Sequence, residues 1–265
     1  MNPDHVLMPL AARYAEWLAL PEELVAASVD AVDAGESGVD EVWAMPMVLR
    51  LERAEPPART ALLEAAAAAA LAVCLDPLAE PGGPWHDVLV NWTHRNIRKV
   101  TRRARGAHWT AVLDLPGITE SVAGAQVRAL LPGPVSEVPR EVARLQIAGS
   151  DLPADEPGAS DPDFPVLWLD PAVPMTAGKA AAQVGHGSML LAALLVASGA
   201  DQALADWAAA DCRCSVRVAT PDRWTKLHPG DDPVAAWRDR RVVAVRDAGF
   251  TEVAPGTVTV LAQWP

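Results

Sequence analysis

The chain has 265 residues, enough for one large domain or for two domains of about 100 residues each. Hydrophobic residues make up 51% of it, which excludes disorder over most of its length. The formal net charge of −12 argues against a protein that coats nucleic acid non-specifically, because such binding depends on neutralising phosphates with Lys and Arg. Any contact with RNA is therefore expected to be local.

The apolar runs that most resemble membrane spans are short. Ala65 to Leu75 and Met189 to Val196 fall well below the roughly 20 residues that a bilayer requires. The first residues lack the basic segment and apolar stretch of a secretory signal, and the three cysteines have no disulfide-framework spacing. We therefore expect a protein of the reducing cytoplasm with no membrane contact.

Residues 1–40 are expected to form a helical extension that ends in an acidic connector, because apolar residues recur at helical spacing before Pro21. No chemistry is evident in them. The next unit, residues 41–149, begins with an apolar strand at Met47 to Leu51. A Pro-containing loop and a long Ala-rich helix follow this strand.

A basic run follows that helix, since no acidic residue occurs between Val88 and Leu113. Such a run is either a solvated basic face or a local docking site for RNA, and the sequence leaves both interpretations open. The run concentrates six of the 22 basic residues, namely Arg95, Arg98, Lys99, Arg102, Arg103 and Arg105.

Residues 150–164 are rich in Gly, Pro, Ser and Asp and are predicted to be a linker. In residues 165–265, strands alternate with helices, which is typical of an α/β fold. We expect two tandem copies of a small three-layer unit, each with a mixed sheet of about four strands flanked by helices. The second copy is predicted to have strands at 165–170, 212–219, 241–246 and 257–264, and helices at 177–198, up to 210 and at 233–240.

The tandem arrangement is inferred from a repeated pattern. Shared composition alone could produce such matches, but their constant spacing favours an internal duplication, with a degenerate first copy at about residues 41–133. Trp92 and Trp109 have the same separation as Trp207 and Trp224, and between them Arg98 aligns with Arg213 and Arg102 with Arg217; further on, Gly117-Ile118-Thr119-Glu120 aligns with Gly249-Phe250-Thr251-Glu252.

The helix predicted at 177–198 carries a polar stripe. Lys179, Gln183 and His186 stand at i, i+4 and i+7, so they share one face of an otherwise apolar helix. A lysine in the first turn opposes the helix dipole unless a phosphate or a developing oxyanion lies in front of the helix. The alternative is a lysine bent back to solvent. His186 is either a general base or base-stacking group, or a buried structural histidine, and Gly178 would allow a ligand or another backbone to approach.

Asp247 and Thr251 follow the strand predicted at 241–246. Ligands of α/β sheets bind beyond the carboxyl ends of strands, so both residues are site candidates, although an Asp in a turn often bonds only its own backbone. Cys212 and Cys214 share a strand face, but a structural zinc site needs four ligands and no second pair has the required spacing. We expect no metal site.

These motifs resemble the two ends of the type-2 peptidyl-tRNA hydrolase family, over about residues 165–265. The resemblance implies hydrolysis of the ester between a peptide and the 3′ ribose of tRNA during translation, with no metal or organic cofactor. It makes Lys179, Asp247 and His186 the catalytic candidates and Gln183, Thr251 and Gly178 the substrate-binding ones. Asp247, directly or through His186, would orient a water while Lys179 stabilises the oxyanion. The motifs read Gly178-Lys179-x-Ala181-Ala182-Gln183-x-x-His186 and Asp247-Ala248-Gly249-x-Thr251-x-x-x-Pro255-Gly256-Thr257-x-Thr259-x-Leu261.

The sequence departs from the family in the middle strand, where Cys212 and Cys214 replace an expected Gln and Lys, and in the loop before the helix, which lacks a lysine. In the duplicated pattern, Lys99 matches Cys214. We therefore expect a division of labour, in which the first copy supplies cationic contacts to tRNA through Arg98, Lys99 and Arg102 and the second supplies the hydrolytic site.

Two alternatives remain. The acidic charge and the lost lysines favour a non-catalytic tRNA- or RNA-binding protein of the same fold. The second alternative is a structural module whose copies pack as an internal pseudo-dimer. A homodimer is also compatible with the sequence. The retained polar residues favour the enzyme, since nothing physical would keep a lysine at a helix N-terminus once catalysis was lost.

Overall fold

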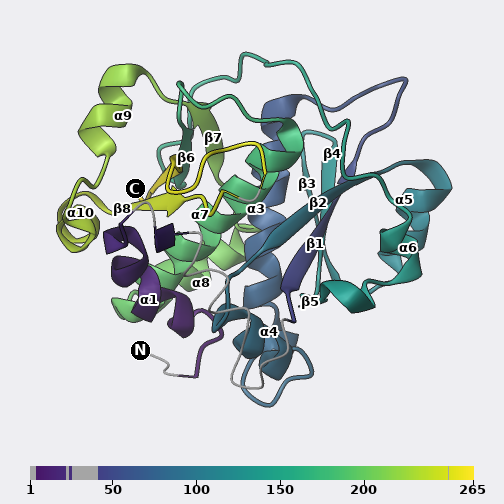
Figure 1. Cartoon of the computed structure of the whole chain (residues 1–265), viewed down its shortest axis with the longest axis horizontal. Helices are drawn as coiled ribbons and strands as arrows, with labels where there is room; N and C mark the ends of the chain where they lie inside the picture. Colours follow the sequence, from purple (N-terminus) through teal and green to yellow (C-terminus); the bar gives the residue numbers. More distant parts are fainter. Residues whose placement is uncertain (1–3, 22–23, 26–40, 250) are drawn as a thin grey trace.

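The computed structural model describes residues 4–21, 24–25, 41–249 and 251–265. Two mixed sheets lie on either side of a central pair of long helices, and further helices cover the outer face of each sheet (Figure 1). Each unit therefore has three layers, which confirms the predicted α/β class with two mixed sheets. The predicted acidic connector lies outside the described residues.

The N-terminal unit contains a sheet with the strand order β2-β1-β4-β3, and the short β5 also pairs with β1. β1 is parallel to β2 and antiparallel to β4. The strands are β1 (Trp43–Arg50), β2 (Lys99–Ala104), β3 (Gly117–Val122), β4 (Ala125–Leu130) and β5 (Gly133–Pro134). The helices are α3 (Arg59–Leu75), α4 (His86–Thr93), α5 (Gly106–Leu113) and α6 (Arg140–Ala143), with 3-10 turns at Pro77–Ala79 and Val135–Glu137.

The C-terminal unit repeats this arrangement, with the order β7-β6-β9-β8, a parallel β6–β7 pair and antiparallel β6–β9 and β8–β9 pairs. The predicted elements occur in the predicted order. The short helix α9 was not predicted; the Thr220 side chain caps its first turn. The elements are β6 (Val166–Leu169), α7 (Ala177–Ala197), α8 (Asp201–Ala209), β7 (Ser215–Val218), α9 (Pro221–Leu227), α10 (Pro233–Arg240), β8 (Val242–Arg246) and β9 (Val258–Gln263).

The first part of the repeated pattern agrees with this topology. Trp92 and Trp207 lie in α4 and α8, and Trp109 and Trp224 lie in α5 and α9, which occupy corresponding places in the two units. These tryptophans therefore mark equivalent helices. The duplication itself stays a prediction.

The second part of the pattern pairs unlike structures. Gly117-Ile118-Thr119-Glu120 forms part of β3, whereas Gly249 and Thr251 lie in the loop after β8. The cause is a difference in loop length: β3 and β4 are joined by Ala123 and Gly124 alone, while residues 247–257 separate β8 from β9. The alignment of these two segments was therefore wrong.

The central helices α3 and α7 pack closely because small residues face each other. Ser188 Oγ donates a hydrogen bond to the Ala67 carbonyl oxygen at 2.7 Å, and a Cβ on Gly185 would lie 3.0 Å from the Ala70 Cβ. α7 is long and apolar enough to cross a membrane by composition, but 83% of its most apolar window is buried within the protein. It is therefore accounted for as a core helix.

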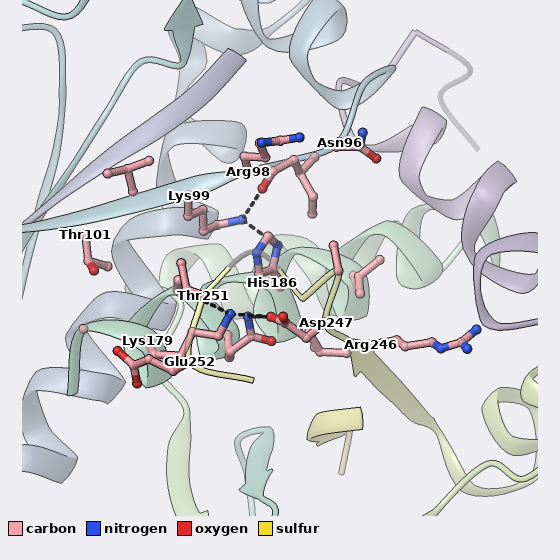
Figure 2. Close-up of a pocket in the computed structure, with 18 of the residues that line it drawn as sticks. Asn96, Arg98, Lys99, Thr101, Lys179, His186, Arg246, Asp247, Thr251 and Glu252 are labelled. Atoms are coloured by element: carbon pink, nitrogen blue, oxygen red, sulfur yellow. Dashed lines mark hydrogen bonds and ion pairs between the residues drawn. The ribbon is translucent and has the colours of Figure 1, made fainter. Parts of the chain in front are cut away.

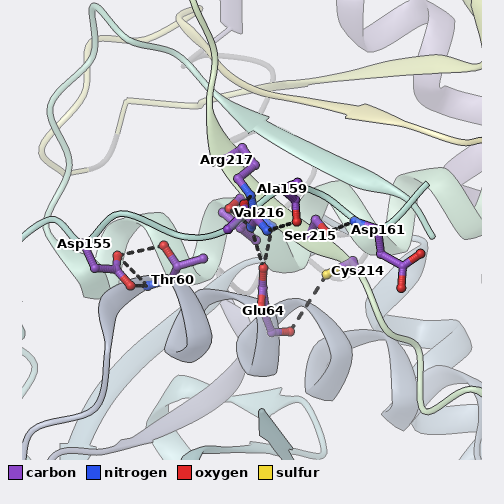
Figure 3. A network of polar contacts seen from close by, with 10 residues as sticks. Thr60, Glu64, Asp155, Ala159, Asp161, Cys214, Ser215, Val216 and Arg217 are labelled. Carbon is purple, nitrogen blue, oxygen red and sulfur yellow. Dashed lines mark hydrogen bonds and ion pairs between the residues drawn. The ribbon is translucent and has the colours of Figure 1, made fainter. Parts of the chain in front are cut away.

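The predicted linker contacts both units along its length (Figure 3). The Asp155 carboxylate accepts hydrogen bonds from the Thr60 N–H and hydroxyl at the start of α3. Further on, Gly158 and Ala159 carbonyl oxygens accept hydrogen bonds from Arg217, whose guanidinium also pairs with Glu64 at 2.8 Å. The segment is thus tied to the first turn of α3 and to β7.

The helix α1 (Met8–Ala19) joins the two units. Arg13 donates to the carbonyl oxygens of Thr93 and Arg95 at 2.6 and 2.5 Å. On the other side, the Tyr14 hydroxyl accepts a 2.7 Å hydrogen bond from the Ala244 N–H of β8, the outermost strand of its sheet. α1 therefore covers a sheet edge that would otherwise expose backbone groups.

We expect Tyr14→Phe to lower the free energy of unfolding by about 1–3 kcal/mol, because it leaves the buried Ala244 N–H without its acceptor. Urea denaturation measures the loss, and amide exchange should become faster at Ala244. Ala12→Ser, on the exposed side of α1, is the control. Unchanged exchange at Ala244 would contradict this role of Tyr14.

Candidate functional site

A cleft of about 890 Å³ lies between the two units (Figure 2). Its walls are the first turns of α7, the loop after β8, the start of β2 and one side of α1. The residues predicted as catalytic all line it. Its polar and charged lining includes Arg13, Glu16, Arg95, Asn96, Arg98, Lys99, Thr101, Ser150, Asp151, Thr176, Lys179, Gln183, His186, Arg246, Asp247, Thr251 and Glu252, and its apolar lining includes Leu10, Trp17, Leu20, Ile97, Ile147, Leu190 and Val245.

An ion pair between Lys179 and Asp247 forms the base of the cleft. Lys179 Nζ lies 2.6 Å from Asp247 Oδ2, and their side chains are 10% and 5% exposed. The same ammonium donates to Thr251 Oγ1 at 3.0 Å. The lysine is therefore held inside the site and is not bent back to solvent. Two of its three N–H donors are engaged by these partners.

Gln183 holds the carboxylate from the other side. Its Nε2 donates to Asp247 Oδ2 at 2.8 Å, while its Oε1 accepts from the Thr259 hydroxyl at 2.5 Å. Because a carboxylate only accepts and only the amide nitrogen donates, Asp247 fixes the orientation of the Gln183 amide, and the Thr259 hydroxyl then donates to the amide oxygen. Thr259 was not among the predicted site residues, although it belongs to the tail motif and lies near the start of β9, the final strand.

Asp247 also closes its own loop. Its Oδ1 accepts from the Gly249 N–H at 2.7 Å, and its backbone pairs with Thr257 and Gly256. Asp247 is therefore both a turn residue and a site residue: its Oδ1 bonds the backbone of its own loop, and its Oδ2 bonds Lys179 and Gln183. Because three donors, one of them an ammonium, surround this carboxylate, it is engaged as an acceptor and poorly placed to take a proton from water.

The N-terminus of α7 is already satisfied by the protein. Glu252 accepts hydrogen bonds from the N–H and hydroxyl of Thr176, and Ser150 Oγ accepts from the Gly178 N–H at 3.1 Å. These contacts take up N–H groups that were expected to face a bound phosphate or oxyanion, which leaves the Lys179 ammonium as the group that could meet such an anion. The bound anion itself stays a prediction. A Cβ at Gly178 would lie 2.5 Å from Ser150 Oγ, so this glycine admits the protein's own chain.

A second pair joins the two units across the cleft. Lys99 Nζ of β2 lies 3.2 Å from His186 Nδ1 of α7 (Figure 2). Burial lowers the pKa of Lys99 to about 7. Burial, together with the charges of Lys99 and Lys179, holds the pKa of His186 well below its ordinary value, so the imidazole is neutral at physiological pH.

The basic run is neither a solvated face nor a single docking surface. Arg105 is exposed and the other five members are half-buried. Arg98 and Lys99 line the cleft, but Arg102 does not: it lies on the opposite face of the sheet, where its guanidinium donates to the Leu145 carbonyl oxygen at 2.9 Å. Because side chains alternate along a strand, Lys99 and Arg102 point to opposite faces. The position of Arg102 contradicts its predicted contact with the substrate.

The substituted cysteines lie away from the cleft. Cys214 faces α3, with its Sγ 4.0 Å from the Glu64 carbonyl oxygen, and burial raises the pKa of its thiol. Lys99, its counterpart in the repeated pattern, is the residue that reaches the cleft. In the part of the chain that the structure describes, His, Cys, Asp and Glu form no group that could hold a metal.

The model of the family described as Peptidyl-tRNA hydrolase PTH2 matches residues 166–265. This match confirms the resemblance seen in the two motifs, and it covers the unit that carries the Lys179–Asp247 pair. The N-terminal unit lies outside it. No curated protein and no solved structure matches the chain.

The buried ion pair can be tested by a double-mutant cycle. We expect Lys179→Met to lower the free energy of unfolding by about 3–5 kcal/mol, because it leaves the Asp247 carboxylate buried beside neutral donors only, the Gln183 amide and the Gly249 N–H. In a protein that already carries Asp247→Asn, Lys179→Met should lower the free energy of unfolding by much less. Urea denaturation of the four proteins gives the coupling energy. The exposed pair Arg238–Asp239 is the matched control, with an expected coupling below about 1 kcal/mol.

The lowered pKa of Lys99 predicts a pH-dependent stability. Between about pH 7 and its ordinary pKa, the unfolded chain binds a proton at Lys99 that the folded protein does not, so stability should increase with pH. The slope from this residue is at most about 1.4 kcal/mol per pH unit. Lys99→Met should reduce the gain between pH 7 and pH 9 in urea denaturation, whereas the exposed Lys226→Met should not. An equal gain in both variants would refute this assignment.

Proposed function

We propose that the protein hydrolyses the ester that joins a peptide to the 3′ ribose of tRNA, with the reacting carbonyl bound between Lys179 and His186. The observation that carries the proposal is the Lys179 ammonium, held by Asp247 and Thr251 on the same helical face as a neutral histidine, with a third donor that contacts no acceptor among the described residues. A positive group and a proton acceptor that line the same cleft are what ester hydrolysis by water requires.

In this reaction, water attacks the ester carbonyl carbon and gives up a proton to His186 Nε2. The carbonyl oxygen becomes an oxyanion, which the third N–H of Lys179 stabilises. When the bond from carbon to the ribose 3′ oxygen breaks, the proton returns from His186 to that oxygen. The products are the tRNA 3′ hydroxyl and the peptide carboxylic acid, which releases its proton to solvent and becomes the carboxylate, so no other reactant is needed.

The remaining polar residues of the site position these two groups. Asp247 compensates the charge of Lys179 and fixes its ammonium, and Gln183 in turn fixes Asp247. Thr251 holds a second N–H of Lys179. In this proposal the carboxylate is a positioning group, which replaces the expectation that Asp247 itself orients the water.

The two units divide the work in this proposal. The C-terminal unit supplies the hydrolytic groups, and the N-terminal unit supplies Arg98 and Lys99 at the opposite wall, where a nucleotide of the acceptor end can lie. The same strand order in both units supports an internal pseudo-dimer. α1, for which the sequence suggested no role, adds Trp17 and Leu20 as an apolar surface for the peptide or the terminal base.

The test is peptide release from N-acylaminoacyl-tRNA by the purified chain. Lys179→Ala should reduce the rate by about 100-fold or more, as expected when a group that stabilises an oxyanion is removed. Asp247→Asn should reduce it too, because Lys179 then loses its partner. Lys226→Ala and Asp239→Asn, which change exposed residues of the same charges far from the cleft, should leave the rate unchanged.

Three other outcomes would contradict the proposal. Binding of the tRNA without release by the parent protein would favour the non-catalytic RNA-binding alternative. Release that persists in Lys179→Ala would place the chemistry elsewhere. If the parent protein neither binds the tRNA nor releases the peptide, either the cleft binds another ester or the protein is a purely structural module.

A further inference from the structure

His186 has one ring nitrogen in a defined contact and one open to the cleft. Nδ1 lies 3.2 Å from Lys99 Nζ, while Nε2 makes no hydrogen bond to any residue that the structure describes. The ring is part of the cleft lining. A neutral imidazole carries its proton on one nitrogen only, so the partner of Nδ1 decides what Nε2 can do.

The contact is built from both units. Lys99 leaves β2 of the N-terminal unit, passes over the ring of Trp92 at 5.1 Å from its centroid and reaches α7 of the C-terminal unit. It crosses α7 at Gly185, where a Cβ would lie 3.1 Å from Lys99 Cε. The absence of a side chain at residue 185 therefore leaves the room that Lys99 occupies.

The two protonation states of Lys99 allow different arrangements of His186. An ammonium group has donors only, so it must donate to Nδ1, which leaves the imidazole proton on Nε2. A neutral amine has a lone pair as well as N–H donors, so it can accept from Nδ1–H, which leaves a lone pair on Nε2. In the first state His186 is only a hydrogen-bond donor toward the cleft, and only the second state allows it to be a base.

We infer that Lys99 is a positioning residue of the hydrolytic site, because it selects the tautomer of His186 and thereby decides whether His186 can accept the proton of the attacking water. Its part in catalysis rests on the proposed function, whereas its control of the tautomer does not. The N-terminal unit, outside the matched family segment, thus supplies a working part of the site.

The groups around Lys99 and His186 place the change of tautomer near neutral pH. Lys99 faces the thiol of Cys74 from α3, which burial keeps protonated by raising its pKa to about 12, and His186 from α7. His186 is further influenced by Lys179 on its own helix. Burial brings the pKa of Lys99 to about 7, so both states are populated in the physiological range.

The experiment is a long-range proton–nitrogen NMR spectrum of the full chain, labelled at histidine and titrated from about pH 5.5 to 9. His186→Asn assigns the signals. We expect the His186 proton to move from Nε2 to Nδ1 with a midpoint near pH 7. Lys99→Arg, which stays cationic, should hold it on Nε2 at every pH. Lys99→Gln, which does not titrate, should abolish the transition, and circular dichroism checks that both variants fold.

A pH-independent tautomer in the parent, or a transition that survives in Lys99→Arg, would overturn the inference. The release assay separates it from the proposed function. If the parent hydrolyses the ester, its rate should rise about tenfold between pH 6 and pH 8, and by less than about twofold in Lys99→Arg. A tautomer transition without any release would leave the inference standing and reject the hydrolase.

Discussion

The contact between α3 and α7 is the constraint on which the rest of the structure depends. Alanines occupy most of the buried face of α3, and Gly185 and Ser188 meet them on α7, so the two backbones approach closely enough for Ser188 to donate to the Ala67 carbonyl oxygen. Each helix packs mainly on its own unit's sheet, α3 on β3 and β4 and α7 on β8 and β9, while β7 also reaches α3 and β2 also reaches α7. The start of β2 consequently lies over α7, and the cleft exists because two units, each with its own sheet, share one helical layer.

Arginines fasten the segments around this layer. Arg13 and Arg246 hold α1 and the chain after it through main-chain carbonyl oxygens, and Arg217 holds the segment between the units. A hydrogen bond to a charged donor contributes about 1.5–3 kcal/mol, roughly twice that of a neutral one. Guanidinium groups used in this way are less available to phosphates. An acidic chain with few free cations suits a substrate recognised at its acceptor end better than one held along its whole backbone.

The sequence predicted what depends on local pattern. The strands and helices of the C-terminal unit, and the stripe of Lys179, Gln183 and His186, are properties of periodicity within one segment. The contacts that complete the site join distant segments: Lys99 meets His186, and Glu252 meets Thr176, only because the units pack as they do. Periodicity shows which face of an element is apolar but not which element will cover it. The same limit explains Arg102, whose membership of a basic run said nothing about its face of β2.

The two units are incomplete in complementary ways. The loop at 247–257 gives the C-terminal unit Asp247 and Thr251, whereas a tight turn joins β3 to β4. α3 is apolar where α7 has its polar stripe, and Glu64, its buried charge, is paired with Arg217. At the start of β2, Lys99 faces the cleft, whereas Cys214, its counterpart just before β7, faces α3. The N-terminal unit therefore supplies the lysine that the C-terminal unit lacks. The shared helical layer brings these parts together within one chain, so a residue absent from one unit need not be absent from the site.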